Sequence, residues 1–230
     1  MWNRKDLKTQ GKAAMKRNYW KSVLVGIVDA LLLSGATAAA RTNGNVNDAQ
    51  TQITTEGFSP AAMMALFAAL AGLAVIVLLA SLVANALLVG PLRVGSSRFK
   101  LSALQGVGNI SELGSGFDSN YKNNVKAMFL SSLYIGLWSL LLVIPGIIKS
   151  YEYRMVPYIL AGEPGLSARE VLDRSKDMMD GNKWNAFVLD LSFLLWDILN
   201  GITFGLSGLF YSNPYKSMTD AALYEAVKNG

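Results

Sequence analysis

The sequence predicts an all-α fold, a polytopic membrane helix bundle with about six hydrophobic segments in three hairpins plus a short cytoplasmic amphipathic helix. Residues 57–92 contain no Asp, Glu, Lys or Arg. This run exceeds the roughly 20 apolar helical residues that cross a hydrocarbon core about 30 Å thick. Only 16% of the 230 residues are charged, whereas soluble domains average about 25%. The basic residues stand mostly in loops beside apolar runs, which is typical of signals that orient a protein in a membrane.

The composition also limits the chemistry that the chain can perform. There is no Cys and no His, so thiolate nucleophiles, Cys ligands and the usual general base near neutral pH are absent. Residues 106–111 (GVGNIS) lack the Lys of a phosphate-binding loop, and no G-x-S-x-G motif is present. We therefore expect no catalytic residue, no cofactor, no metal site and no nucleic-acid partner, and the protein is predicted not to be an enzyme.

The chain begins with a basic stretch followed by an apolar one. Residues 1–19 hold six basic side chains against one acid, which predicts a cytoplasmic N-terminus, either as a short basic helix on the membrane surface or as a solvated tail. Residues 20–40 are predicted to be the first membrane segment. The small-residue run ATAAA before Arg41 also fits a cleavable signal peptide, but the segment is long enough to span, which favours retention as a helix.

A second membrane segment is expected at residues 61–90, after a polar loop at 41–60 that suits the outer face. The pair Gly90-Pro91 is a plausible stop or kink for this helix. Residues 93–125 contain basic side chains and Gly-rich and Asn-rich pieces, so they are predicted to form a cytoplasmic loop that is too short for a domain of its own.

A third segment at residues 126–144 closes at Pro145-Gly146. Residues 147–161 are largely apolar but charged, and a chain that runs outward through 126–144 must return before the basic residues that follow 162. We therefore expect a returning segment at 147–161, shielded from lipid because of its charges. A single helix that ends at Pro145 is the alternative.

A short amphipathic helix is predicted at residues 168–180. Ser167 and Glu170 form a capping box, and Gly181 is a natural C-terminal stop. One helical face collects the apolar positions Val171, Leu172, Ser175, Met178 and Met179. We expect this helix to lie on the inner membrane surface or on the underside of the bundle.

The last two segments are expected at residues 185–200 and 205–225, as a hairpin that turns near 201–205. A single helix that uses Gly201 and Gly205 for close packing is the alternative. The hairpin returns the C-terminus to the inner face, and Pro214 would bend its second arm. The whole chain, 1–230, is then one membrane domain with six spans and both termini cytoplasmic; four spans is the alternative topology.

Ionisable residues inside the apolar segments form the candidate site, because such residues cost about 2.5–3.5 kcal/mol on insertion and usually face the protein interior or water. Asp190 and Asp197, seven residues apart, would share one helix face, and Lys149 and Glu152 can pair. These acids either line a polar cavity as a proton or ion relay, or form structural ion pairs. The candidate residues are Asp29, Lys149, Glu152, Arg154, Asp190 and Asp197.

Several stretches resemble a known family. LWSLLLVIPGIIKSYEYRMVPYILA at 137–161, SKDMMDGNKW at 175–184, LSFLLW at 191–196 and NPY at 213–215 are similar to the bacterial membrane proteins grouped as domain of unknown function 975. The chain departs from the family pattern at Leu195 and at residues 205–207. The resemblance implies a multi-pass protein of the bacterial cell membrane, and it implies no established activity.

These observations favour a non-enzymatic membrane protein that binds, scaffolds or assists transport. Its expected partners are the bilayer, anionic lipid headgroups at the cytoplasmic face and a membrane protein. A secondary transporter or channel is the alternative, and it would require the breaks at 145–146 and 201–205 to meet at the bilayer midplane. An intramembrane enzyme is the least favoured function, since no arrangement of residues in the sequence indicates a catalytic site.

Overall fold

The computed structural model describes residues 2–41, 60–118 and 120–229, and every regular element in these ranges is a helix. The predicted all-α class is therefore confirmed. Most of the polar loop expected at 41–60 lies outside the described residues.

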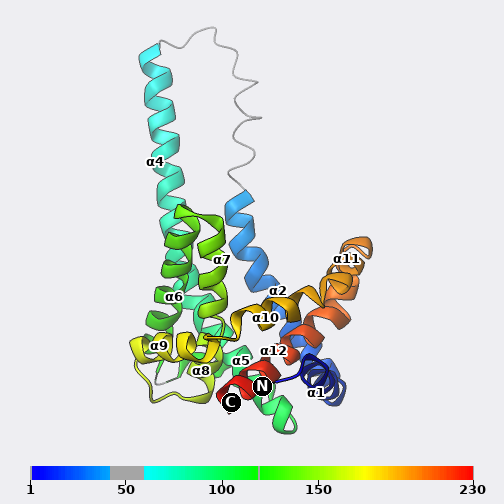
Figure 1. The fold of residues 1–230 in the computed structure, drawn as a ribbon. Helices are drawn as coiled ribbons and strands as arrows, with labels where there is room; N and C mark the ends of the chain where they lie inside the picture. The colour runs from blue at the N-terminus through cyan, green and yellow to red at the C-terminus, as the bar shows by residue number, and fades with distance from the viewer. Residues whose placement is uncertain (1, 42–59, 119, 230) are drawn as a thin grey trace.

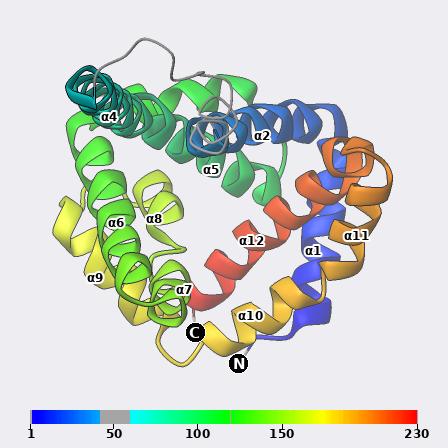
Figure 2. The same ribbon diagram turned by 90° about the horizontal axis from the view of Figure 1, so that it is seen from above.

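One set of helices rises from a base formed by the others, and both termini lie at that base (Figure 1). The rising elements are α2 (Tyr19–Arg41), α4 (Pro60–Ala84), α6 (Tyr121–Leu141), α7 (Val143–Glu152), α11 (Leu194–Ile202) and the π-helix η3 (Gly208–Ser212). The base contains α1 (Arg4–Arg17), α5 (Gly90–Gln105), the 3-10 helix η2 (Ile110–Phe117), α8 (Val156–Gly162), α9 (Ala168–Met179) and α12 (Asn213–Lys228). The helix α10 (Lys183–Leu191) connects the base to α11. From above, the rising helices surround α12 (Figure 2).

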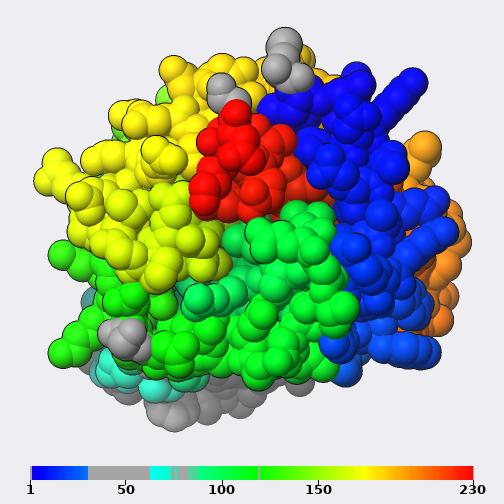
Figure 3. All heavy atoms as spheres, turned by 90° about the horizontal axis from the view of Figure 1, so that it is seen from below, coloured from blue at the N-terminus to red at the C-terminus, as the bar shows by residue number. Residues whose placement is uncertain are grey.

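The basic N-terminal stretch forms α1, which packs on the C-terminal helix α12. Its apolar stripe of Leu7, Ala14 and Met15 is buried in the core. Gly11 lies so close to Thr219 that a Cβ at Gly11 would come within 2.6 Å of the Thr219 hydroxyl. The expected short basic helix is therefore present, and the alternative of a solvated tail is wrong, because the apolar face of α1 packs into the core of the base. Seen from below, α1 lies beside α12 (Figure 3).

The second hydrophobic segment continues through a π-helical turn, η1 (Asn85–Val89), directly into α5. Pro91 stands in the first turn of α5, where its missing N–H is not needed. The loop predicted at 93–125 is thus wrong over most of its length. The physical reason is close packing. A Cβ at Gly95 would overlap Leu113, and a Cβ at Gly116 would overlap Pro91. Because glycine has no side chain, the backbones of α5 and η2 can pack directly against each other at these positions.

The third segment forms a hairpin of α6 and α7, but its turn is at Leu142, which is extended. The turn expected at Pro145-Gly146 is therefore misplaced by three residues. Pro145 lies in the first turn of α7, a position that proline favours. Gly146 packs against Ser139 of α6, and a Cβ at Gly146 would overlap Ser139. Pro145 and Gly146 therefore belong to the second helix of the hairpin and do not end the first.

The amphipathic helix α9 is confirmed. Ser167 caps it and forms the reciprocal capping box with Glu170, and these hydrogen bonds hold the pKa of the Glu170 carboxyl below its usual value. Gly181 follows with φ of 70°. The five predicted face positions are all buried, and they join the core with α8, so α9 lies against the underside of the bundle.

The final hairpin has its turn at residues 203–205 between α11 and η3, as predicted. Its arms differ from the predicted segments 185–200 and 205–225, because the first arm is interrupted between α10 and α11 and most of the second is α12, which lies in the base. Phe204 and Gly205 have φ of 50° and 90°, the left-handed conformation of a tight turn. The alternative of close packing through Gly201 and Gly205 is wrong, because no atom lies within 4 Å of a Cβ at either position. Pro214 lies just after η3, at the start of α12.

Two segments among the described residues are long and apolar enough to cross a membrane, Tyr121–Leu141 and Lys183–Ile202. Only 22% and 17% of the most apolar 18-residue window of each segment are buried inside the protein, unlike the mostly buried core helix of a soluble domain. This is fewer than the six spans predicted. The returning arm α7 has 10 residues and α11 has 9, so each rises only about 15 Å.

Candidate functional site

Arg154 is the centre of a polar network between α7 and α8. Its guanidinium donates to both carboxylate oxygens of Asp190 on α10, at 2.7 and 2.9 Å, and to Asp220 on α12 at 2.7 Å. The Tyr151 hydroxyl donates to Asp190 at 2.8 Å, and Lys216 approaches the same carboxylate at 3.6 Å. One cation therefore ties three elements together.

Three further ion pairs involve Glu152 and Asp29. Glu152, only 3% exposed, accepts from Lys149 at 2.8 Å and from Lys183 at 3.4 Å. Asp29 of α2 and Lys100 of α5 are 2.8 Å apart. Each carboxylate in these contacts faces at least one basic group, an arrangement that stabilises the ionised form of both partners.

The structure places five of the six predicted residues in ion pairs: Asp29, Lys149, Glu152, Arg154 and Asp190. The exception is Asp197, which is exposed on α11 and forms no ion pair with any described residue. It does not share a helix with Asp190, because α10 ends at Leu191. The carbonyl of Ser192 there accepts from Lys8 of α1 at 3.1 Å, and a new helix begins two residues later.

Sequence reasoning missed four partners, Lys100, Lys183, Lys216 and Asp220. Asp220 could have been found, because it is an acid inside the segment predicted at 205–225. Lys100 could not, since residues 93–125 were expected to be a loop. Among the described residues, no group of three or more Asp or Glu side chains could hold a metal ion.

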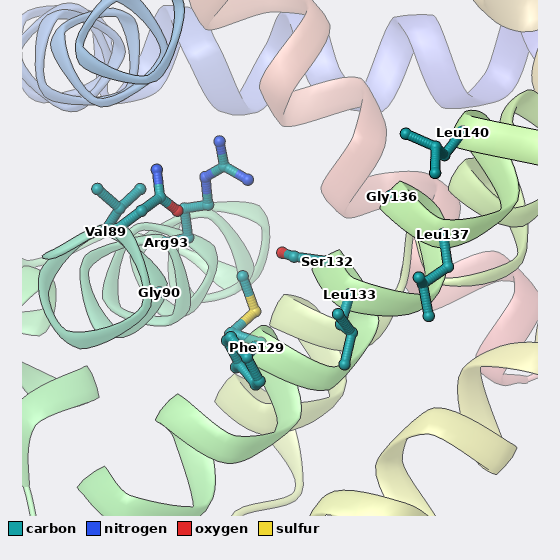
Figure 4. A pocket seen from close by; sticks show the side chains of 11 residues that line it. Val89, Gly90, Arg93, Phe129, Ser132, Leu133, Gly136, Leu137 and Leu140 are labelled. Carbon is teal, nitrogen blue, oxygen red and sulfur yellow. The ribbon is translucent and has the colours of Figure 1, made fainter. Parts of the chain in front are cut away.

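A groove separates α6 from η1 and the start of α5 (Figure 4). Its cavity volume is about 320 Å³, and its only polar side chains are those of Asn85, Arg93 and Ser132. The rest of the wall is apolar, formed by Val89, Met128, Phe129, Leu133, Leu137 and Leu140, with Gly90 and Gly136. Leu140 is 87% exposed, so the groove opens to the outside of the bundle.

Comparison with known proteins identifies a family for most of the chain. No curated protein and no solved structure matches the chain. The model of one family, described as "Protein of unknown function (DUF975)", matches residues 63–230, which include both hairpins, the groove and every member of the Arg154 network. Since this match spans well over half of the sequence, the chain belongs to the DUF975 family.

Proposed function

We propose that the chain is a non-enzymatic integral membrane protein that binds an anionic lipid of the cytoplasmic leaflet in the groove beside α6. In this role it would serve as a binding or scaffolding component, or as an accessory to transport. The groove with Arg93 at one end is the observation that carries the proposal.

The distribution of exposed side chains supports a membrane location. The α6–α7 turn exposes five consecutive apolar residues, Leu140, Leu141, Leu142, Val143 and Ile144, each by 66% or more. The helix α4 has 25 residues without a charge. In water, apolar surface of this extent favours association with a partner or with lipid.

The basic side chains lie at the opposite end and support a cytoplasmic base. Exposed cations of α1 include Lys5, Lys12 and Lys16, and both termini lie at the same end (Figure 1). An excess of Lys and Arg marks the cytoplasmic face of membrane proteins. The proposed orientation in the cell membrane therefore has both termini inside, with the three hairpins opening toward the cytoplasm.

The shape and charge of the groove support an anionic lipid as its occupant. Its volume is close to the lower limit of about 300 Å³ for small-molecule pockets, and such pockets are mostly apolar with a few polar groups that fix orientation. Arg93 lies toward the base, while Leu137 and Leu140 lie toward the α6–α7 turn. An acyl chain along α6 would place an anionic headgroup beside Arg93.

The relay or transporter alternative draws less support. A proton relay needs an acid that can change its charge, whereas the acids Asp29, Glu152 and Asp190 each face a basic group within 4 Å. Buried ion pairs of this kind are more often structural. The turns at Leu142 and Phe204 are exposed rather than packed together around a substrate.

A groove-filling variant tests the proposal. Gly136→Leu adds a side chain to the groove wall without a clash, because nothing lies within 4 Å of a Cβ there. Gly72→Leu on α4 is the matched control, since that position is equally open and lies outside the groove. Arg93→Gln removes the cation.

The measurement is binding of spin-labelled phosphatidylglycerol and phosphatidylcholine to the protein in nanodiscs. We expect wild type and Gly72→Leu to prefer phosphatidylglycerol, and Gly136→Leu and Arg93→Gln to lose most of that preference. An unchanged preference in both groove variants would refute binding at this site.

A further inference from the structure

We infer that the α6–α7 and α11–η3 hairpins enter the hydrocarbon from the cytoplasmic side and turn round inside it, without reaching water on the far side. The inference rests on the proposed membrane location. Its partner surface is the acyl-chain interior of the bilayer, which the two turns contact directly. Three features of the structure lead to it: the heights of the helices, the composition of the turns and the hydrogen bonding of the second turn.

The first feature is the difference in height between α4 and α6. A Cβ at Gly90 would lie 3.1 Å from Met128 of α6, so these two residues lie side by side. Asn85 stands five residues before Gly90 and Ser132 four residues after Met128, and both line the groove, so Asn85 and Ser132 lie at a similar level. From Ser132, α6 continues for nine residues to Leu141, a rise of about 14 Å. From Asn85, α4 extends back over 25 residues to Pro60, a rise of about 38 Å.

Figure 1 shows α4 rising well past the α6–α7 turn. A hydrocarbon core is about 30 Å thick, so α4 is long enough to cross it. The α6–α7 turn lies on the order of 24 Å short of the far end of α4, the difference between the two rises. If α4 crosses the membrane, the turn stays inside.

The second feature is the composition of the turns. Turns in water are rich in Gly, Asn, Asp, Ser and Pro, because these residues adopt turn conformations and bind water. Residues 140–144 are LLLVI, without a polar side chain. The second turn does contain Gly201, Gly205 and Ser207, but its Phe204 is 98% exposed and stands between exposed Ile202 and Leu206. Both turns thus present their largest apolar side chains outward.

The third feature is the hydrogen bonding of the second turn, where every backbone N–H from residue 203 to residue 209 has an acceptor. Five of them donate to carbonyl oxygens of Leu199, Gly201, Asn200, Thr203 and Gly205, at 2.9–3.4 Å. The other two use side chains. The N–H of Ser207 donates to the Thr203 hydroxyl at 3.1 Å, and the N–H of Gly208 donates to the Asn200 amide oxygen at 2.8 Å.

This complete pairing has a physical reason in lipid. Water can satisfy the free N–H groups of an exposed turn, but hydrocarbon cannot, so each must find a partner within the protein. Gly208 makes the contact possible, because a Cβ there would overlap the Asn200 side chain. The first turn is less completely paired: Pro145 has no N–H, and the N–H groups of Leu142 and Gly146 donate to Trp138 and Leu142, whereas Val143 and Ile144 begin α7 without an acceptor among the described residues.

Site-directed labelling tests the inference, and the absence of native Cys makes single-Cys variants of the full chain straightforward. We would prepare Leu142→Cys and Phe204→Cys at the turns. Lys176→Cys on the exposed side of α9 serves as a reference for the base, and Met64→Cys as a reference near the outer end of α4. All four positions are exposed, so the substitutions should leave packing intact.

Two measurements are needed. A membrane-impermeant maleimide is applied to intact cells and to permeabilised cells, and nitroxides on the same variants in nanodiscs report depth by collision with oxygen and with a nickel chelate. We expect residues 142 and 204 to resist the maleimide in both preparations and to be the deepest. Residue 176 should react only after permeabilisation.

Reaction at 142 or 204 in intact cells would overturn the inference, because the hairpins would then cross the membrane. Recovery of the protein in the soluble fraction, with all four positions reactive, would overturn the proposed membrane location as well. The two failures are therefore distinguishable.

Discussion

Arg154 offers the sharpest test of whether the polar network is structural. Replacing it by Met removes three hydrogen bonds to Asp190 and Asp220, whose side chains are mostly buried. Breaking a buried ion pair by deleting one partner costs about 3–5 kcal/mol, because a charge is left uncompensated. Asp190 would keep Lys216 and Tyr151 nearby, whereas Asp220 would lose its only ion-pair partner among the described residues.

The expected loss for Arg154→Met is therefore about 3 kcal/mol, at the lower end of that range. The assay is denaturant unfolding in bicelles, followed by Trp fluorescence. The control is Arg169→Met, which replaces an exposed side chain and should change stability by no more than about 0.5 kcal/mol.

A rescue variant separates the ion pair from simple packing. Combining Arg154→Met with Asp190→Asn and Asp220→Asn removes the uncompensated charges, and we expect it to recover most of the lost stability. A loss below about 1 kcal/mol for the single variant, of the size of an exposed ion pair, would refute the structural role of the network. The acids would then regain their place as candidates for a relay.

Three further substitutions test local contacts. Gly11→Ala should cost about 1–3 kcal/mol, since its Cβ would lie 2.6 Å from Thr219, and hydrogen exchange should show α1 loosening. Thr203→Val should cost about 1–3 kcal/mol by leaving the Ser207 N–H unpaired, while Thr203→Ser should stay within about 0.5 kcal/mol of wild type; equal unfolding midpoints for the two would contradict this. Ser167→Ala should cost about 1 kcal/mol through the lost cap, measured by thermal unfolding.

The correct predictions from the sequence rest on local signals. The helix α9 was predicted with its cap at Ser167, its buried face and its stop at Gly181, and all three are present. A capping box, an apolar stripe and a glycine each act within a few residues, so the sequence contains them completely. The turn near 201–205 was predicted for the same reason.

Features decided by distant contacts were not predicted. Residues 93–125 are predicted to be a loop because they contain basic side chains and Gly-rich and Asn-rich pieces. In the fold, Asp29 pairs with Lys100, and the glycines of this region contact η2. Pro145 was read as a break, although proline suits the first turn of a helix equally well; the contact of Gly146 with Ser139 shows which applies. The partners of Arg154 lie 36 and 66 residues away.

The number of membrane crossings is the point at which sequence rules are least informative for this chain. Counting basic residues identifies the side to which a hairpin returns, but a hairpin that turns inside the bilayer returns to the same side as one that crosses. Hydropathy counts apolar segments. The helix α7 has only 10 residues, but hydropathy adds the apolar turn to it and so counts the two together as one segment. Two features distinguish a hairpin that turns inside the bilayer from one that crosses it. One is the length of each arm compared with that of a helix that crosses completely, and the other is whether the backbone N–H groups of the turn have acceptors within the protein. Both depend on three-dimensional structure, so a count of hairpins from the sequence does not determine the count of crossings.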